Sequence, residues 1–85
     1  MPRFFFHTQN DTDYTDEEGI DLPDMESART QAALLTAALL KDGASRFWAS
    51  GPWTLTVTDE DGLVFFTIAT HGMEAPVASA VALRG

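Results

Sequence analysis

The side chains best suited to chemistry in this sequence are its two histidines and a run of acids near the N-terminus. His7 and His71 are the only histidines among the 85 residues, and cysteine is absent. Two imidazoles with nearby carboxylates could bind a metal ion or exchange protons if the fold brought them together. Nothing in their spacing requires this, and a strand histidine and a loop histidine explain the pattern. We therefore predict no metal site and no cofactor. A small-ligand or metal-binding protein using His7, His71 and nearby acids is kept as an alternative.

The acidic run Asp11–Glu18 places carboxylates at alternating positions, as calcium-binding loops do. If Asp11 is position one, Asp16 stands at position six, where such loops need glycine, and Leu22 stands at position twelve, where they need glutamate. The run therefore indicates a solvated turn rather than a calcium site.

Nucleophilic catalysis and phosphate binding also lack their usual patterns. The chain has no cysteine, no serine in a Gly-x-Ser-x-Gly turn and no glycine-rich phosphate loop. Its five basic residues are too scattered to clamp a phosphate: Arg3, Arg29, Lys41, Arg46 and Arg84. A chain of this length also has little room to enclose a substrate pocket. We predict that it is not an enzyme.

The formal charge of −8 restricts the class of partner. Nucleic acids and anionic membrane surfaces attract basic proteins, so neither is expected to bind here. The run Ala32–Leu40 is far shorter than the ~20 residues that span a bilayer. The N-terminus lacks the long apolar stretch of a signal peptide. These features predict a cytoplasmic protein whose partner is another protein, or a second copy of itself.

Apolar spacing predicts one α+β domain over residues 1–70, with the order ββαββ, and a C-terminal tail over 71–85. The expected strands are Arg3–Thr8, Thr12–Thr15, Trp53–Thr58 and Leu63–Ala69, forming a four-stranded antiparallel sheet. One amphipathic helix is expected over Met25–Asp42, with Asp24 as its N-cap and Gly43 just beyond its end. Residues Ala44–Pro52 are expected to form a connection. The helix should pack on the sheet through Met25, Ala28, Ala32, Leu35 and Leu39.

The second hairpin predicts a register and, from it, an interaction surface. A four-residue loop, Asp59–Gly62, pairs Val57 with Val64, Leu55 with Phe66 and Trp53 with Ile68, all on the helix side. That register turns Phe65 to the outer face beside Thr56. An outer face carrying Phe5, Phe65, Thr54 and Thr56 is more apolar than a solitary small domain needs. We predict contact with another protein, or self-association into a homo-oligomer, through the sheet.

Three segments together resemble a family of short bacterial proteins without an assigned function. Met1–His7 gives the opening Met-Pro-Arg, aromatics and histidine, and Asp16–Asp24 gives an acidic-Gly-x-x-Leu-Pro-Asp segment before an alanine-rich helix. Val57–Gly62 fits the strand and Asp-x-x-Gly hairpin that follow. The resemblance covers roughly residues 1–70 and implies no catalytic residues.

A looser likeness is to the N-terminal domain of HicB-type antitoxins, which runs strand, strand, turn, proline-rich segment, helix and strand. Glu18-Gly19 and Leu22-Pro23-Asp24 follow that order, although the Pro-Gly-Cys that usually follows and a DNA-binding tail are missing. This likeness implies the sheet-and-helix topology, with an antitoxin-like regulator as an alternative role.

Overall fold

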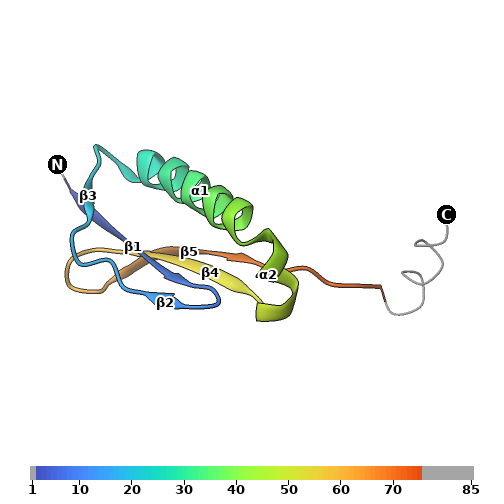
Figure 1. The fold of residues 1–85 in the computed structure, drawn as a ribbon. Coiled ribbons are helices and arrows are strands. Elements are labelled where there is room, and N and C mark those ends of the chain that lie inside the picture. Colours follow the sequence, from blue (N-terminus) through green and yellow to red (C-terminus); the bar gives the residue numbers. More distant parts are fainter. Residues whose placement is uncertain (1, 76–85) are drawn as a thin grey trace.

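The computed structural model describes residues 2–75 and shows an α+β fold with one helical layer on one face of a sheet (Figure 1). The elements, in chain order, are β1 (Arg3–Gln9), β2 (Asp13–Tyr14), β3 (Ile20–Asp21), α1 (Met25–Asp42), α2 (Ala44–Ser50), β4 (Trp53–Thr58) and β5 (Val64–Thr70). The predicted fold class is confirmed, with five strands in place of four.

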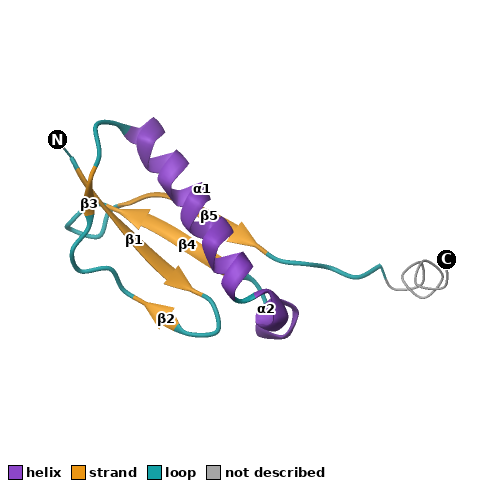
Figure 2. Ribbon diagram, turned by 45° about the horizontal axis from the view of Figure 1, so that its top comes forward, coloured by secondary structure: helices purple, strands orange, loops and turns teal. Residues whose placement is uncertain are grey.

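The sheet is antiparallel and has the order β2-β1-β4-β5 (Figure 2). β3 pairs with β1 on the same side as β2, so the two short strands share one edge of β1. Ile20 and Asp21 lie in the segment before the helix, where no strand was expected. They form a strand because Phe4 pairs with Ile20 and Arg3 pairs with Asp21, and the Arg3 side chain also forms an ion pair with that aspartate.

The helix α1 begins and ends as its cap residues predict. The Asp24 carboxylate accepts a hydrogen bond from the backbone N–H of Ser27 at 2.8 Å, and the Gly43 N–H donates to the Leu39 carbonyl at 2.9 Å. Ala28 and Ala32 are fully buried against the sheet. Small side chains at these two positions let the helix approach the sheet closely, so large residues from the strands fill the core.

The two central strands, β1 and β4, supply most of the large side chains of that core. Its buried members are Phe4, Phe6, Ala28, Ala32, Leu55 and Val57, with Leu22, Met25, Leu35, Leu39, Phe66 and Ile68 packed around them. Trp53 is also buried, at 4% exposed. The alternation that predicted strand Trp53–Thr58 therefore identified the helix-facing side of β4 correctly.

The segment predicted as a connection, Ala44–Pro52, contains the second helix, α2. Phe47 anchors it, because its ring lies edge-on to the Trp53 ring with 5.3 Å between centroids. Gly43 joins α1 to α2, and a Cβ atom there would lie 2.4 Å from Cη2 of Trp53. The close approach of an indole ring to the backbone thus requires glycine at this joint.

The register of the β4–β5 hairpin differs from the predicted one. The observed partners are Val57 with Phe66, Leu55 with Ile68, and Trp53 with Thr70. The loop before β5 spans Asp59–Leu63 and is closed by a hydrogen bond from the Asp59 N–H to the Leu63 carbonyl. The first pair after it joins Thr58 to Val64, and a register shift follows between Val57 and Thr58.

This β-bulge overturns the predicted position of Phe65. The outer-face partner of Thr56 is Thr67, and Phe65 is the extra residue between two successive pairs. Its ring instead lies against Phe4, with 5.5 Å between centroids. Phe4 belongs to the core, so the bulge lets the Phe65 ring pack against the core. Regular alternation would have directed this ring outward.

Past β5, residues 71–75 are exposed and lie outside the helices and strands. The remainder of the expected tail, residues 76–85, lies outside the described residues. Within the described part, no helix has the length and apolar character needed to cross a membrane.

Candidate functional site

His7 lies on the outer face of the sheet, where both of its ring nitrogens are engaged. The backbone N–H of Asp16 donates to Nδ1 at 3.1 Å, and Nε2 lies 2.9 Å from Oγ1 of Thr58. The Thr58 hydroxyl in turn donates to the Asp59 carbonyl at 2.9 Å. Because the Asp16 N–H can only donate, Nδ1 is its acceptor, and Nε2 is the ring nitrogen that meets the Thr58 hydroxyl.

Asp16 fastens the loop between β2 and β3 to the open edge of β1. Its Oδ2 accepts from the Phe6 N–H, and its Oδ1 accepts from the N–H groups of Glu18 and Gly19, each at 3.1 Å. Partial burial opposes ionisation, but these three donors and the nearby His7 outweigh it and lower the pKa of Asp16 below its ordinary value. The carboxylate is therefore a structural acceptor, held in its charged form.

A cleft of about 560 Å³ opens beside these two residues. It is lined by Phe5, His7, Thr15, Asp16, Glu17, Thr58, Asp59, Glu60 and Gly62. Asp59 also serves the fold, because its Oδ1 accepts from the N–H groups of Asp61 and Leu63 and so closes the hairpin loop. A general base needs a lone pair directed at substrate, whereas the accepting nitrogen of His7 is occupied by Asp16.

The structure does not bring the two histidines together. His71 lines a separate cleft of about 220 Å³, with Phe47, Trp48, Gly51, Pro52 and Gly72. This cleft lies beside α2 and the end of β5, and the Trp48 ring packs against Gly72. Among the described residues, no three histidine or carboxylate side chains are grouped so as to hold a metal ion.

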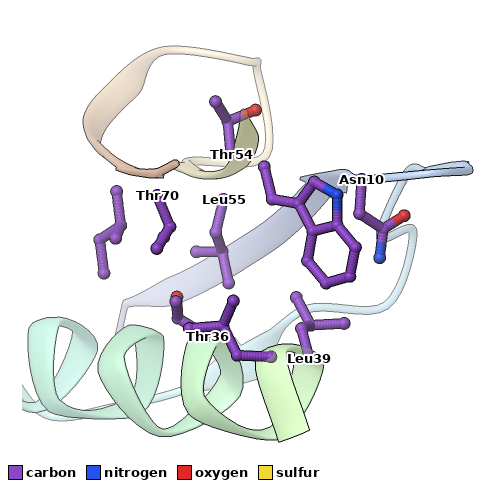
Figure 3. Close-up of a pocket in the computed structure, with 9 residues that line it drawn as sticks. Asn10, Thr36, Leu39, Thr54, Leu55 and Thr70 are labelled. Atoms are coloured by element: carbon purple, nitrogen blue, oxygen red, sulfur yellow. The ribbon is translucent and has the colours of Figure 1, made fainter. Parts of the chain in front are cut away.

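A small internal cavity of about 10 Å³ lies between α1 and the sheet (Figure 3). Its lining includes Asn10, Thr36, Thr70 and Trp53. The indole Nε1 of Trp53 is buried and has no hydrogen-bond partner. Leu39, Leu40, Leu55 and Ile68 form the apolar part of the lining. A space of this size beside a buried donor holds one water molecule at most, and no substrate.

A larger groove of about 570 Å³ runs between α1 and the β2–β3 side of β1. Leu35 and Leu39 form its helical wall, and Tyr14 and Ile20 stand on its strand side, 59% and 37% exposed. The groove exists because β2 and β3 have only two residues each. On the edge of β1 opposite β4, they leave the middle of the strand without a neighbouring strand.

The residues predicted to form an interaction surface are divided between two places. Thr54 and Thr56 are on the outer face, where their hydroxyls contact Gln9 and Thr67 at 3.3 Å. Phe5 shares that face but is half-buried, because its ring lies close to Gly19 of the covering loop. Phe65 packs on Phe4 instead. The outer face is therefore rich in threonine and does not form an aromatic patch.

Several exposed apolar side chains that sequence reasoning missed lie at the start of β5, and others are Leu34, Trp48 and Met73. Leu63 is 63% exposed and Val64 is 54% exposed, next to Phe65 at 37%. β5 is also the last strand of the sheet, so its outer edge has no strand beside it in the described part of the chain. The uncharged run was visible in the sequence, but its position at an edge was not.

Comparison with protein families gives one match, to the domain of unknown function DUF6894, over residues 3–71. The match therefore covers every helix and strand described above. Searches of curated proteins and of solved structures find no significant match. With most of its length matched by this model, the chain belongs to the DUF6894 family.

Proposed function

We propose that this chain is a small, non-enzymatic interaction module that associates with itself through its sheet. The observation that carries the proposal is strand β5, seven residues long, uncharged and unpaired along its outer edge within residues 2–75. Such an edge offers a row of backbone donors and acceptors to another strand.

The contacts of the polar side chains support a non-enzymatic role. His7, Asp16 and Asp59 could have served acid–base chemistry, yet each is bonded to backbone or side-chain groups that hold loops in place. The metal-binding alternative needs His7 and His71 together, and they line different clefts. The geometry thus favours a scaffold over a reaction centre.

The charge of the chain predicts how association responds to salt. Two copies, each carrying −8, repel one another over most of their surfaces, so contact is favoured where charge is absent. Screening that repulsion should strengthen self-association as salt rises. The cleft that contains Asp16, Glu17, Asp59 and Glu60 could instead contact a basic partner. The affinity of that contact would decrease as salt rises.

Sedimentation velocity on the full chain tests this function. We expect a mass of twice the monomer at ~100 μM, with the dimer fraction increasing between 20 mM and 300 mM NaCl as the Debye length shortens. A monomeric mass at both salt concentrations would overturn the proposal.

A further inference from the structure

The two edges of the sheet are treated differently by the fold. On one side β2 and β3 pair with β1, and between them the Asp16 carboxylate accepts the Phe6 N–H at 3.1 Å. On the other side nothing in the described residues pairs with β5. Proteins usually protect such an edge with lysine, proline, a very short strand or a β-bulge. β5 has a bulge at Phe65, but Val64–Thr70 is seven residues long without charge or proline.

Charge and backbone geometry together identify a second copy as the occupant of this edge. Between Asp61 and Glu74 the sequence has no Asp, Glu, Lys or Arg, so an oppositely charged partner would find no counter-charge along the strand. An antiparallel strand edge is complementary to itself, because a two-fold axis carries its donors onto its own acceptors. A second chain is thus able to match the regular part of this edge, which follows the bulge at Phe65.

We propose that two copies pair β5 to β5, antiparallel, about a two-fold axis that passes between the two Thr67 residues. This inference rests on the proposed self-association and gives it a surface and a register. In an antiparallel pair, hydrogen-bonded and non-hydrogen-bonded residue pairs alternate along the strands. A two-fold axis cannot exchange one type of pair for the other, so it must pass through a pair formed by one residue and its own copy. Thr67 is the middle of Val64–Thr70, and centring there pairs Phe66 with Ile68 on either side of the axis, short of the bulge at Phe65.

The register joins the apolar layers that lie beneath the two helices. Regular pairing ends at the bulge, because Phe65 is turned toward Phe4 whereas Ala69 lies on the outer face. Phe66 and Ile68, which are half-buried beside α1, face one another across the pair. The hydrophobic layer beneath each helix then continues from one molecule into the next.

Disulfide trapping tests the register directly, because the natural chain contains no cysteine and each variant carries one thiol. Thr67→Cys places two thiols opposite one another at the axis, where Cβ atoms of facing residues are ~5 Å apart. Under mild oxidation we expect a covalent dimer to form at least tenfold faster than in the control. Circular dichroism of each reduced variant checks that the fold is kept.

The matched control is Ala69→Cys, an exposed position on the same face of the same strand. In the proposed register two Ala69 residues are separated by four positions, or roughly 13 Å. Two results would overturn the register and leave the proposed function standing, provided that the natural chain has a dimeric mass. One is trapping at residue 69 that is as fast as at residue 67 or faster, and the other is trapping at neither residue. A monomeric mass for the unmodified chain would overturn both.

Discussion

At the residue scale, Asp16 has the largest number of structural hydrogen bonds for one side chain in the acidic segment. One carboxylate joins β1 to two backbone groups of the β2–β3 loop. The sequence marked Asp16 only as the residue that spoils a calcium loop. Its role depends on Phe6, which is ten positions away and meets it only after β1 and the loop have folded together.

We predict that Asp16→Asn lowers the free energy of unfolding at pH 7 by about 2 kcal/mol. The amide can still accept from the loop, but its NH2 group faces the Phe6 N–H, and a hydrogen bond to a charged group is worth about that amount. Urea unfolding checks the value. Asp13→Asn changes the same charge at an exposed position and is expected to have little effect.

The effect of Asp16→Asn should also depend on pH. Because the folded pKa of Asp16 is lowered, its ionised form stabilises the fold above the pKa of an unfolded aspartate, near 4. That stabilisation is lost as the pH falls through the lower folded value. The difference between the natural chain and the variant should therefore shrink from pH 5 to pH 2. A difference that stays constant over this range would contradict the assignment.

Trp53 gives a second prediction at the residue scale. Its buried Nε1 lacks a partner beside a cavity of about 10 Å³, and the cavity wall also contains Asn10, Thr36 and Thr70. We expect one ordered water there, bound by the indole N–H. NMR should show a cross-relaxation peak between the Trp53 indole proton and a long-lived water. If the indole proton signals of both tryptophans are resolved and Trp53 shows no such peak, the predicted water is absent. Trp48, which is more exposed, serves as the comparison.

At the element scale, the joint between α1 and α2 is set by a steric contact. Gly43 has φ −110°, a conformation open to any residue, so its backbone does not require glycine. What requires glycine is the Trp53 ring, 2.4 Å from the position of a Cβ. Trp53 is itself held by Phe47 of α2. The second helix, the joint and β4 therefore form one packed unit.

Gly43→Ala tests that unit. We expect it to lower the free energy of unfolding by about 1–3 kcal/mol, the usual cost of overpacking, because Trp53 is buried and has little space to move. Gly51→Ala is the control: a Cβ there meets nothing within 4 Å, although φ is +81°. Its cost should be confined to backbone strain of about 1 kcal/mol. Thermal and urea unfolding compare the two, and an unaffected Gly43→Ala would contradict the steric account.

Over the whole molecule, the acidic side chains leave the long edge strand free of charge. Carboxylates gather in the Asp11–Glu18 segment and the Asp59–Asp61 loop, whereas β5 has none. Repulsion between two chains that each carry −8 limits the contacts that two copies can make. In the proposed dimer, contact is therefore favoured along the uncharged edge of β5.

Placing a charge on that edge should therefore disrupt the dimer. We predict that Thr67→Glu raises the dissociation constant at least tenfold, because like charges face one another at the axis. Ala33→Glu, on the exposed face of α1, adds the same charge away from β5 and should change it by less than about threefold, as an exposed charge is screened. Equal effects from the two variants, measured by sedimentation, would show that net charge alone controls association.

Local sequence was enough to predict the parts of this protein that depend on near neighbours. Asp24 and Gly43 mark the ends of α1 because caps bond within a few residues, and strict alternation from Trp53 identified the buried side of β4. The turn at Gly62 followed in the same way, with φ +89°. These features are local, so composition and spacing were enough to predict them.

The position of Phe65, the contacts of His7 and the edge position of β5 depend on tertiary structure. Phe65 turns to Phe4 through a bulge, and that aromatic contact joins strands 61 positions apart in sequence. His7 links the β2–β3 loop to β4, because Asp16 and Thr58, far from it in sequence, both bond its ring. The edge position of β5 follows from the strand order of the sheet, which no local pattern encodes. Each of these depends on long-range pairing, where burial and packing choose among registers that the sequence alone leaves equally plausible.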